Sequence, residues 1–484
     1  MPDSPRLGPT AFVLAGGGTK GSFEVGALQY LVGVEGITPD IVTATSAGAI
    51  AATVLAQGRT LDEFAQRVQE IEDDILAMTR TEYVFGQQSW LKALNGTKLG
   101  RTIEYSLTEG TRPPFPSGEW GPNAVIPPSG PTRDQRRAAG RARRQRQRRF
   151  LRLALGATFR LPKARRKMRS SGSSVLNLAP LAEAMRVGGP SGILPIDQSL
   201  INRPGLQLRL AVTALRAGVL RYVTETGTIV EADALTPAPG VAAGPVDLVD
   251  GALASASVPL IFPPHPMADD DYVDGGVLQI IPVRAAAQLG ATRIIAVVAM
   301  PLVLARDERD YSNAPASNIG MRALGMIGMA DRQYENLAVA LPEGATLTTI
   351  DPVVDVVGLF EVQPGLLQIN KSYGWLRAAD LLAEGDAAIV ADMSAETHVL
   401  AQKRCDAWTL EEELWTQLKL SDDAVAGKLA LLRELKEDIH DVVVHRKQLG
   451  FPVPEECSDW WSEYELHQGE RPEHLPARPA NCMN

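Results

Sequence analysis

The stretch AFVLAGGGTKGSF, residues 11–23, places a run of glycines between an apolar segment typical of a buried strand and a segment typical of a helix. Gly16, Gly18 and Gly21 fit the pattern G-x-G-x-x-G, in which backbone amides at the start of a helix hold an anion. The residue at the end of the next strand decides the use of such a loop. A dinucleotide site needs an acidic residue there, whereas an acyl-transfer site needs a nucleophile.

The next predicted strand, residues 41–45, ends without an acidic residue. Asp40 lies at about the right distance from the glycines, but it precedes this strand. The strand leads instead into TATSAGAI, in which Ser46 stands among small residues before a predicted helix over residues 47–56. A serine in a sharp strand-to-helix turn exposes its hydroxyl oxygen, and small neighbours allow the tight turn. The same position also suits a helix cap, so Ser46 alone leaves both roles open.

A serine nucleophile requires a base, and the sequence offers two candidates. His265, in FPPHPMADDDYVDGG, is the only histidine before residue 398, but its flanking prolines are typical of a turn. Asp274, in YVDGGVL, follows an apolar run and precedes two glycines, which can leave its carboxylate at the end of a strand. A partly buried carboxylate with a raised pKa can act as a general base, although an Asp-Gly pair is also an ordinary turn. The run Asp269, Asp270 and Asp271 lacks the ligand spacing of a calcium loop, so no metal is predicted.

Three sequence elements occur in a distinctive order: GGGTKGSFEVGAL, then ATSAGAIAATVLA, then ASASVPLIFPP followed by YVDGGVLQIIPV. Together they resemble the patatin-like phospholipases, which are lipid acyl hydrolases with a Ser-Asp dyad. The resemblance covers about residues 10–110 and 174–390. It implies a three-layer α/β/α fold with a central, mostly parallel sheet, and it implies catalysis without a metal or organic cofactor.

The resemblance also implies roles for individual residues. Ser46 would be the nucleophile and Asp274 its base, because the family's aspartate follows the ASASVPLIFPP segment whereas Asp250, in a second Asp-Gly pair, precedes it. The backbone that would form the oxyanion hole belongs to Gly16, Gly17 and Gly18. The residues that complete the family motifs are Lys20, Gly21, Gly48, Gly275 and Gly276.

Two positions depart from the family pattern. Ala44 stands where G-x-S-x-G has its first glycine, and it would strain the turn if the backbone there required a positive φ. The segment VLQIIP lacks the asparagines often found after Asp-Gly-Gly, so the sequence does not show what supports the Asp274 loop. Neither departure removes a reacting group.

The 484 residues include a segment of opposite character to the rest of the chain. The formal net charge is −9, yet 16 Lys or Arg and one acidic residue lie between Arg133 and Arg169. We predict a catalytic domain over residues 1–395, interrupted at about 111–174 by a Pro/Gly-rich and Arg-rich insertion. A helical extension with a Pro-rich tail is predicted over residues 396–484.

The basic segment between Arg133 and Arg169 has three interpretations. It can be a solvated segment, it can contact an anionic membrane surface, or it can bind nucleic acid. The scarcity of aromatic side chains for base stacking argues against nucleic acid. No apolar run is long enough to span a membrane and the N-terminus lacks a secretory signal pattern, so we expect a cytoplasmic protein with peripheral membrane contact as one option. The three cysteines, Cys405, Cys457 and Cys482, lack paired metal-ligand spacing.

The sequence thus predicts a serine acyl hydrolase that cleaves fatty-acyl esters of phospholipids or related lipids. The alternative is a non-catalytic protein on the same fold that binds lipid or a partner. A nucleotide-dependent oxidoreductase is supported only by the literal glycine match. The sequence predicts neither the lipid head group that the protein prefers nor its oligomeric state.

Overall fold

The structure is a computed structural model, and it describes only part of the chain. The described residues are 8–77, 84–95, 97, 174–188, 195–238, 244–268, 270–303, 312, 319, 328–416 and 422–479. The basic segment between Arg133 and Arg169 lies outside them, as do Asp269 and Cys482.

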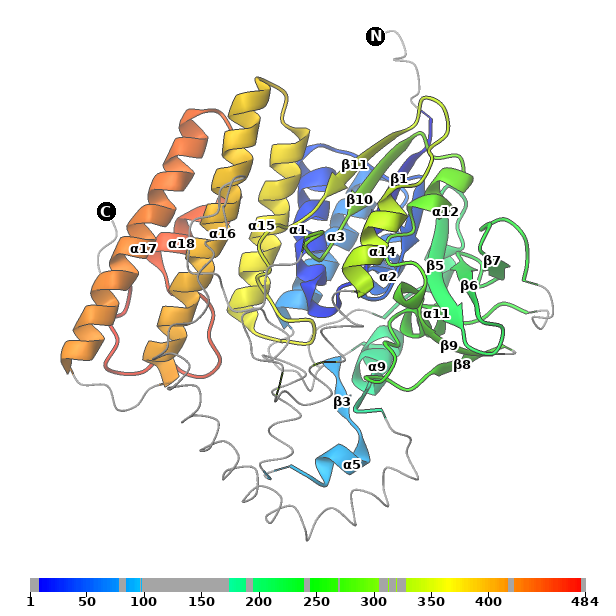
Figure 1. The fold of residues 1–484 in the computed structure, drawn as a ribbon, viewed down its shortest axis with the longest axis horizontal. Helices are drawn as coiled ribbons and strands as arrows, with labels where there is room; N and C mark the ends of the chain where they lie inside the picture. Colours follow the sequence, from blue (N-terminus) through cyan, green and yellow to red (C-terminus); the bar gives the residue numbers. More distant parts are fainter. Residues whose placement is uncertain are drawn as a thin grey trace.

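A nine-stranded mixed sheet lies at the centre of the described residues (Figure 1). Its main path runs in the order β11-β10-β1-β2-β5-β6-β7, and the first five of these strands are parallel. The strands are β1 (Thr10–Leu14), β2 (Ile41–Ala44), β5 (Gln207–Ala214), β6 (Val219–Thr224), β7 (Ile229–Glu231), β8 (His265–Met267), β9 (Asp270–Asp274), β10 (Arg293–Val297) and β11 (Thr346–Ile350). The remaining pairs are antiparallel: β6 and β9 each pair with β5, β7 pairs with β6, and β8 pairs with β9.

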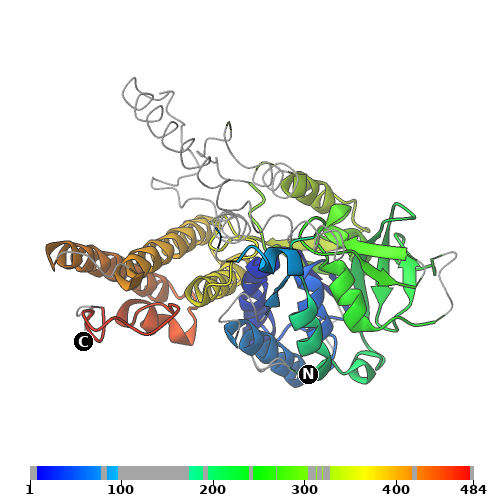
Figure 2. The same ribbon diagram turned by 90° about the horizontal axis from the view of Figure 1, so that it is seen from below.

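Helices cover both faces of the sheet (Figures 1 and 2). Successive side chains of a strand point to opposite faces, so in β1 Phe12 and Leu14 join one hydrophobic cluster while Ala11 and Val13 join another. The first cluster is shared with α1 (Ser22–Leu28), α2 (Ala47–Leu55), α3 (Leu61–Ala77), α9 (Ala179–Val187), α11 (Leu248–Ser255) and α15 (Pro364–Leu382). The second is shared with α12 (Val283–Gln288) and α14 (Gly328–Leu337). The predicted three-layer α/β/α fold is confirmed.

The C-terminal helices extend the molecule sideways from this core (Figure 1). Helix α15 packs on α1 and on α16 (Ala387–Thr416), and α16 packs on α17 (Asp422–Gln448). A third hydrophobic cluster joins them through Leu376, Leu432 and Trp460, the last from α18 (Asp459–Ser462). Helix α16 begins at Ala387, before the predicted boundary at residue 396.

Strands β6 and β7 form a hairpin, in which Gly227 adopts a φ of 74° and turns the chain between them. The short elements are η1 (Gly18–Gly21), η2 (Gln29–Val34), β3 (Gly86–Gln87), α5 (Ser89–Lys92), β4 (Leu176–Asn177), α10 (Gln198–Ile201), η4 (Gly275–Val277) and η7 (Glu455–Ser458).

Candidate active site

The register of the sheet brings the glycine loop, Ser46 and Asp274 to one place. Strands β1 and β2 are neighbours and parallel, so the glycine loop after β1 and Ser46 after β2 emerge at the same edge. Strand β2 pairs with β5 as far as Ala44, opposite Leu210. Strand β9 continues on the same side of β5, with Asp274 opposite Val212, because β6 occupies the other side. Asp274 therefore ends beside the turn that carries Ser46.

Ser46 occupies a strained turn between β2 and α2. Its φ of 57° and ψ of −128° fall outside the regions that residues with a side chain normally adopt, a conformation that costs about 1–3 kcal/mol. Ala44 lies within β2 and has no positive φ, so the strain considered for Ala44 falls on Ser46 instead. Gly48 allows the turn to pack tightly, because a Cβ there would lie 2.7 Å from the carbonyl oxygens of Leu14 and Ala15. Strain concentrated on one serine is typical of a nucleophile.

Asp274 is buried beside Ser46. The Ser46 hydroxyl lies close enough to the Asp274 side chain to stabilise its charged form, and the Gly276 amide donates a hydrogen bond to Asp274 Oδ1 at 2.7 Å. Burial raises the pKa of Asp274 from 3.8 to about 6, and these two groups offset part of that rise. Gly275 permits this geometry, because a Cβ there would lie 2.4 Å from the Ala211 carbonyl oxygen. A carboxylate with this pKa can accept a proton from Ser46 near neutral pH.

Helix α14 supports the loop after Asp274, which sequence reasoning did not find. The Asn336 side-chain oxygen accepts the amides of Ile280 (2.8 Å) and Ile281 (3.0 Å), and Arg332 donates to the Gly276 carbonyl at 3.3 Å. Asn336 thus supplies an asparagine to a loop whose own sequence, VLQIIP, has none. Nothing in the local sequence links Asn336 to a loop more than 50 residues earlier.

The three glycines of the first loop differ in what their amides do. The Gly16 amide donates to the Ile280 carbonyl at 3.4 Å, so it is already engaged. The amides of Gly17 and Gly18 have no acceptor within the described part of the chain. Gly18 adopts a φ of 56°, and a Cβ there would lie 2.1 Å from the Leu359 carbonyl oxygen. Of the three predicted oxyanion donors, Gly17 and Gly18 are therefore the two with free amides.

Lys20 ties the glycine loop to a second loop, and this gives it a role that the sequence left open. Its buried ammonium group forms an ion pair with Asp355. Thr19 makes two further contacts with this second loop. Its amide donates to the Leu359 carbonyl (3.0 Å), and its hydroxyl donates to the Gly358 carbonyl (2.6 Å). These contacts hold the glycine loop in one conformation, which is what preorganised backbone donors require.

Replacing Gly18 by alanine is expected to lower kcat by about 10²–10³-fold, the usual cost of losing an oxyanion donor. The added Cβ would clash with Leu359 and would sit at an unfavourable positive φ, so the loop must move. KM should change much less, because the lost contacts form mainly in the transition state. Steady-state kinetics with a soluble ester measures both constants.

Gly21→Ala is the matched control for that substitution. A Cβ at Gly21 has its nearest neighbours at 3.6 and 3.8 Å, which is ordinary contact, so its kcat should stay near that of the wild type. Equal losses in the two variants would refute a specific role for the Gly18 backbone.

Ser255, at the end of α11, holds the Ser46 turn against the sheet. Its hydroxyl accepts the Ser46 amide at 2.9 Å and donates to the Ala211 carbonyl at 2.7 Å, and all of these groups are buried. The sequence segment ASASVPLIFPP contains Ser255, but only the structure shows its contact with Ser46. Ser255 is a positioning residue for the nucleophile.

Ser255→Ala is expected to lower the free energy of unfolding by about 2 kcal/mol, because it leaves a buried amide and a buried carbonyl unpaired. It should also lower kcat about tenfold or more with little change in KM, since the nucleophile loses its anchor. Ser257→Ala serves as control, because that buried hydroxyl donates to the Leu253 carbonyl in the last turn of α11 and not to the Ser46 turn. Denaturant unfolding and kinetics of both variants check this; identical behaviour of the two would count against the role of Ser255.

The other sequence candidates lie elsewhere. His265 contacts Asp250 at 2.9 Å, and Asp250 also pairs with Arg186, so these side chains form a separate group. Asp270 accepts the amides of Arg216 and Ala217 in the turn between β5 and β6. Within the described ranges, no group of histidine, cysteine or acidic side chains is arranged to hold a metal ion.

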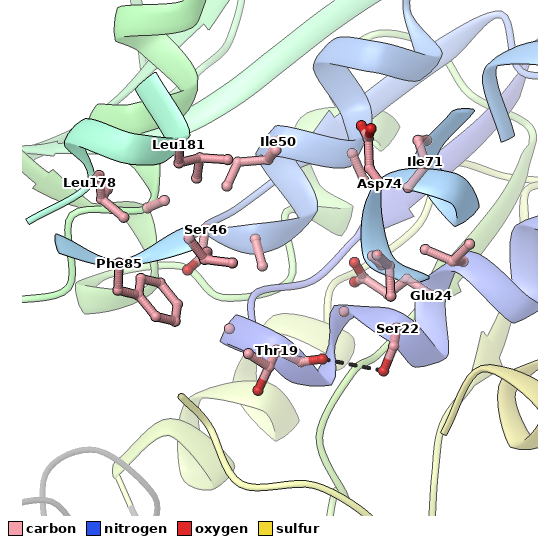
Figure 3. A pocket seen from close by; sticks show the side chains of 18 of the residues that line it. Thr19, Ser22, Glu24, Ser46, Ile50, Ile71, Asp74, Phe85, Leu178 and Leu181 are labelled. Atoms are coloured by element: carbon pink, nitrogen blue, oxygen red, sulfur yellow. Dashed lines mark hydrogen bonds between the residues drawn. The ribbon is translucent and has the colours of Figure 1, made fainter. Parts of the chain in front are cut away.

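A largely apolar pocket opens beside Ser46 (Figure 3). It comprises about 1050 Å³ of empty space, part of it open to solvent, and it lies between α1, α2, α3 and α9. Its apolar wall includes Ile50, Ile71, Phe85, Leu178 and Leu181. Such a wall suits a hydrocarbon chain.

Comparison with known proteins agrees with this geometry. The sequence profile of the patatin-like phospholipases matches residues 12–287, more than half of the chain. The chain belongs to the patatin-like phospholipase family. This membership supports a lipid hydrolase with a lipid substrate. No curated protein gives a significant match to this patatin-like chain.

Two solved structures align with this patatin-like protein over most of its length. VipD from Legionella pneumophila is 13% identical, with 96% of this chain and 92% of VipD covered, at a TM-score of 0.26. The type III effector protein ExoU is 16% identical, with 89% and 72% covered, at a TM-score of 0.21. The family assignment rests on the sequence profile and not on these two alignments. Among the described residues, every helix is too short or too polar to span a lipid bilayer.

Proposed function

We propose that this protein is a serine acyl hydrolase that cleaves fatty-acyl esters of phospholipids or related lipids with Ser46 and Asp274. The observation that carries the proposal is the buried Asp274 carboxylate beside the Ser46 hydroxyl, which stabilises its charged form, at the wall of an apolar pocket. Family membership supports the lipid substrate class.

The reaction follows from the two side chains. Asp274 takes the hydroxyl proton as Ser46 Oγ forms a bond to the ester carbonyl carbon, and the carbonyl oxygen becomes an oxyanion. The intermediate collapses, the bond to the leaving alcohol breaks, and the proton on Asp274 passes to that alcohol. Water then attacks the carbonyl carbon of the acyl-enzyme while Asp274 accepts its proton; the bond to Ser46 Oγ breaks, the proton on Asp274 returns to Oγ, and the fatty acid is released.

The backbone of the glycine loop would stabilise the oxyanion. The amides of Gly17 and Gly18 have no acceptor in the described part of the chain and are rigidly held, and the loop lies beside Ser46, because a Cβ on Gly16 would come within 2.7 Å of Ser46 Cβ. The N-terminus of α2, which begins directly after Ser46, adds a favourable partial positive charge.

Fatty-acid release from phosphatidylcholine vesicles, with and without anionic lipid, tests the proposal. The wild type should release fatty acid and Ser46→Ala should not, while circular dichroism shows that both are folded. The alternative, a non-catalytic lipid-binding protein, predicts binding of vesicles by both proteins with no release by either.

We also propose that residues 1–395 form the catalytic domain, that residues 396–484 form a helical extension, and that the basic segment between Arg133 and Arg169 contacts anionic membrane surfaces. Basic clusters gain about 1 kcal/mol per charge near such surfaces. Flotation with anionic vesicles should be lost when residues 133–169 are deleted, whereas hydrolysis of a soluble ester should persist. Unchanged flotation would dismiss the membrane contact.

A further inference from the structure

The pocket contains a buried carboxyl group that neither the proposed chemistry nor the fold uses. Glu24, in the first turn of α1, lines the pocket and is 0% exposed. Neither of its side-chain oxygens has a hydrogen-bond partner among the described residues, since the nearby Ala15 amide already donates to the Val297 carbonyl at 3.1 Å. Figure 3 shows its carboxyl group turned into the same pocket that Ser46 borders.

The position of Glu24 is close to the reacting centre. A Cβ added at Gly21 would lie 3.8 Å from Glu24 Oε2 and 3.6 Å from the Cβ of Ala47, the residue after the nucleophile. The Glu24 carboxyl therefore lies about one side-chain width from the first turn of α2. An acyl chain attached to Ser46 that follows this wall of the pocket would meet the carboxyl near its ester end.

An unpaired buried carboxyl is costly, at about 1–3 kcal/mol for a neutral group and more for an ionised one. Burial raises the pKa of Glu24 well above its usual range, and the nearby Ala15 amide offsets this only in part. Leucine would fill the same place in an apolar wall without this cost. A ligand group that pairs with the carboxyl would remove this cost.

The chemistry of the missing partner is narrow. An alkyl chain has no hydrogen-bonding atom. A hydroxyl group is both a donor and an acceptor, so it can pair with a carboxyl group whether that group is protonated or ionised. A polar site of this kind discriminates strongly against a ligand that lacks the matching group, because its own polar atoms then stay unpaired.

We infer that Glu24 makes this pocket selective for acyl chains that carry a hydroxyl group near the ester carbonyl. This inference rests on the proposed function, since it names the acyl group that Ser46 would accept. Glu24 acts here as a specificity residue, and the hydrolytic chemistry does not need it.

Kinetics with three esters of one chain length test the inference: decanoyl, 3-hydroxydecanoyl and 10-hydroxydecanoyl. The wild type should hydrolyse the 3-hydroxy ester with a kcat/KM about tenfold above that of the plain ester, the worth of one good hydrogen bond. The terminal hydroxyl should give no such gain, because it lies far from Glu24. Glu24→Leu should remove the preference while retaining hydrolysis of the plain ester, and Glu24→Gln, which keeps a donor and an acceptor, should retain much of it.

A binding measurement separates failure of this inference from failure of the proposed function. Titration of Ser46→Ala with decanoic and 3-hydroxydecanoic acids, with and without Glu24→Leu, reads the preference without hydrolysis. If the wild type cleaves none of the esters, the hydrolase proposal fails and the binding preference alone decides the role of Glu24. The inference would be overturned if protein that retains Glu24 showed no preference for the 3-hydroxy chain over the plain chain. It would also be overturned if the preference survived Glu24→Leu.

Discussion

Ser46→Ala is expected to lower ester hydrolysis by about 10⁴-fold or more, the size of effect seen when a serine nucleophile is removed. The substitution removes only Oγ, the atom that would form the acyl-enzyme. Because Ser46 is held by backbone contacts to Ser255 and Ala49, the turn should survive without its hydroxyl. The measurement is the rate of release of p-nitrophenol from a short-chain ester, with an active-site titration of the wild type as reference.

The matched control for this loss is Thr45→Val, next to the nucleophile. The Thr45 hydroxyl donates to the Gln279 carbonyl at 3.1 Å and takes no part in the proposed chemistry. Thr45→Val should cost stability but keep most of the turnover. Wild-type turnover by folded Ser46→Ala would show that another residue is the nucleophile.

Asp274→Asn should have the second largest effect, a loss of about 10²–10⁴-fold in kcat, the usual contribution of a general base. In the wild type, only the carboxylate form of Asp274 can accept the Ser46 proton. Activity should therefore fall as the pH drops through the Asp274 pKa of about 6, and at pH 5 it should be about a tenth of its plateau. A pH profile of kcat/KM measures this acid limb, which Asp274→Asn should lack.

The same substitution should raise stability, which a purely structural role of Asp274 would not produce. The folded pKa is raised above its unfolded value of 3.8, so folding penalises the charged form, and the penalty is complete above pH 6 and absent below pH 3.8. At about 1.4 kcal/mol per pKa unit, Asp274→Asn should gain up to about 3 kcal/mol at pH 8 and almost nothing at pH 4. A lower Tm than the wild type at pH 8 would contradict a strained, catalytic carboxylate.

Each site residue predicted from the sequence belongs to a short sequence motif. Ser46 and the glycine loop each lie directly after an apolar strand, and parallel neighbouring strands bring such turns together without further information. Asp-Gly-Gly made Asp274 one of two candidate bases, and the order of the family motifs selected it. The layered fold was implied by the resemblance of three sequence elements to the patatin-like phospholipases.

The supporting residues could not be predicted, because long-range packing alone defines them. Ser255 meets Ser46 across 209 positions of sequence, and Asn336 meets Ile280 across 56. In the sequence, Glu24 is an acidic residue in the first turn of a helix, where a negative charge is common and stabilises the helix. Only the packing of the helices around the pocket shows that its carboxyl is buried there.

The central claim is that Ser46 is an activated nucleophile, and covalent labelling tests it most directly. A fluorophosphonate probe should react with the wild-type protein, and peptide mass spectrometry should find the label on Ser46 alone. Labelling should be lost in Ser46→Ala and strongly slowed in Asp274→Asn. Labelling of Ser46→Ala at the wild-type rate, or a label found on another serine, would contradict the account.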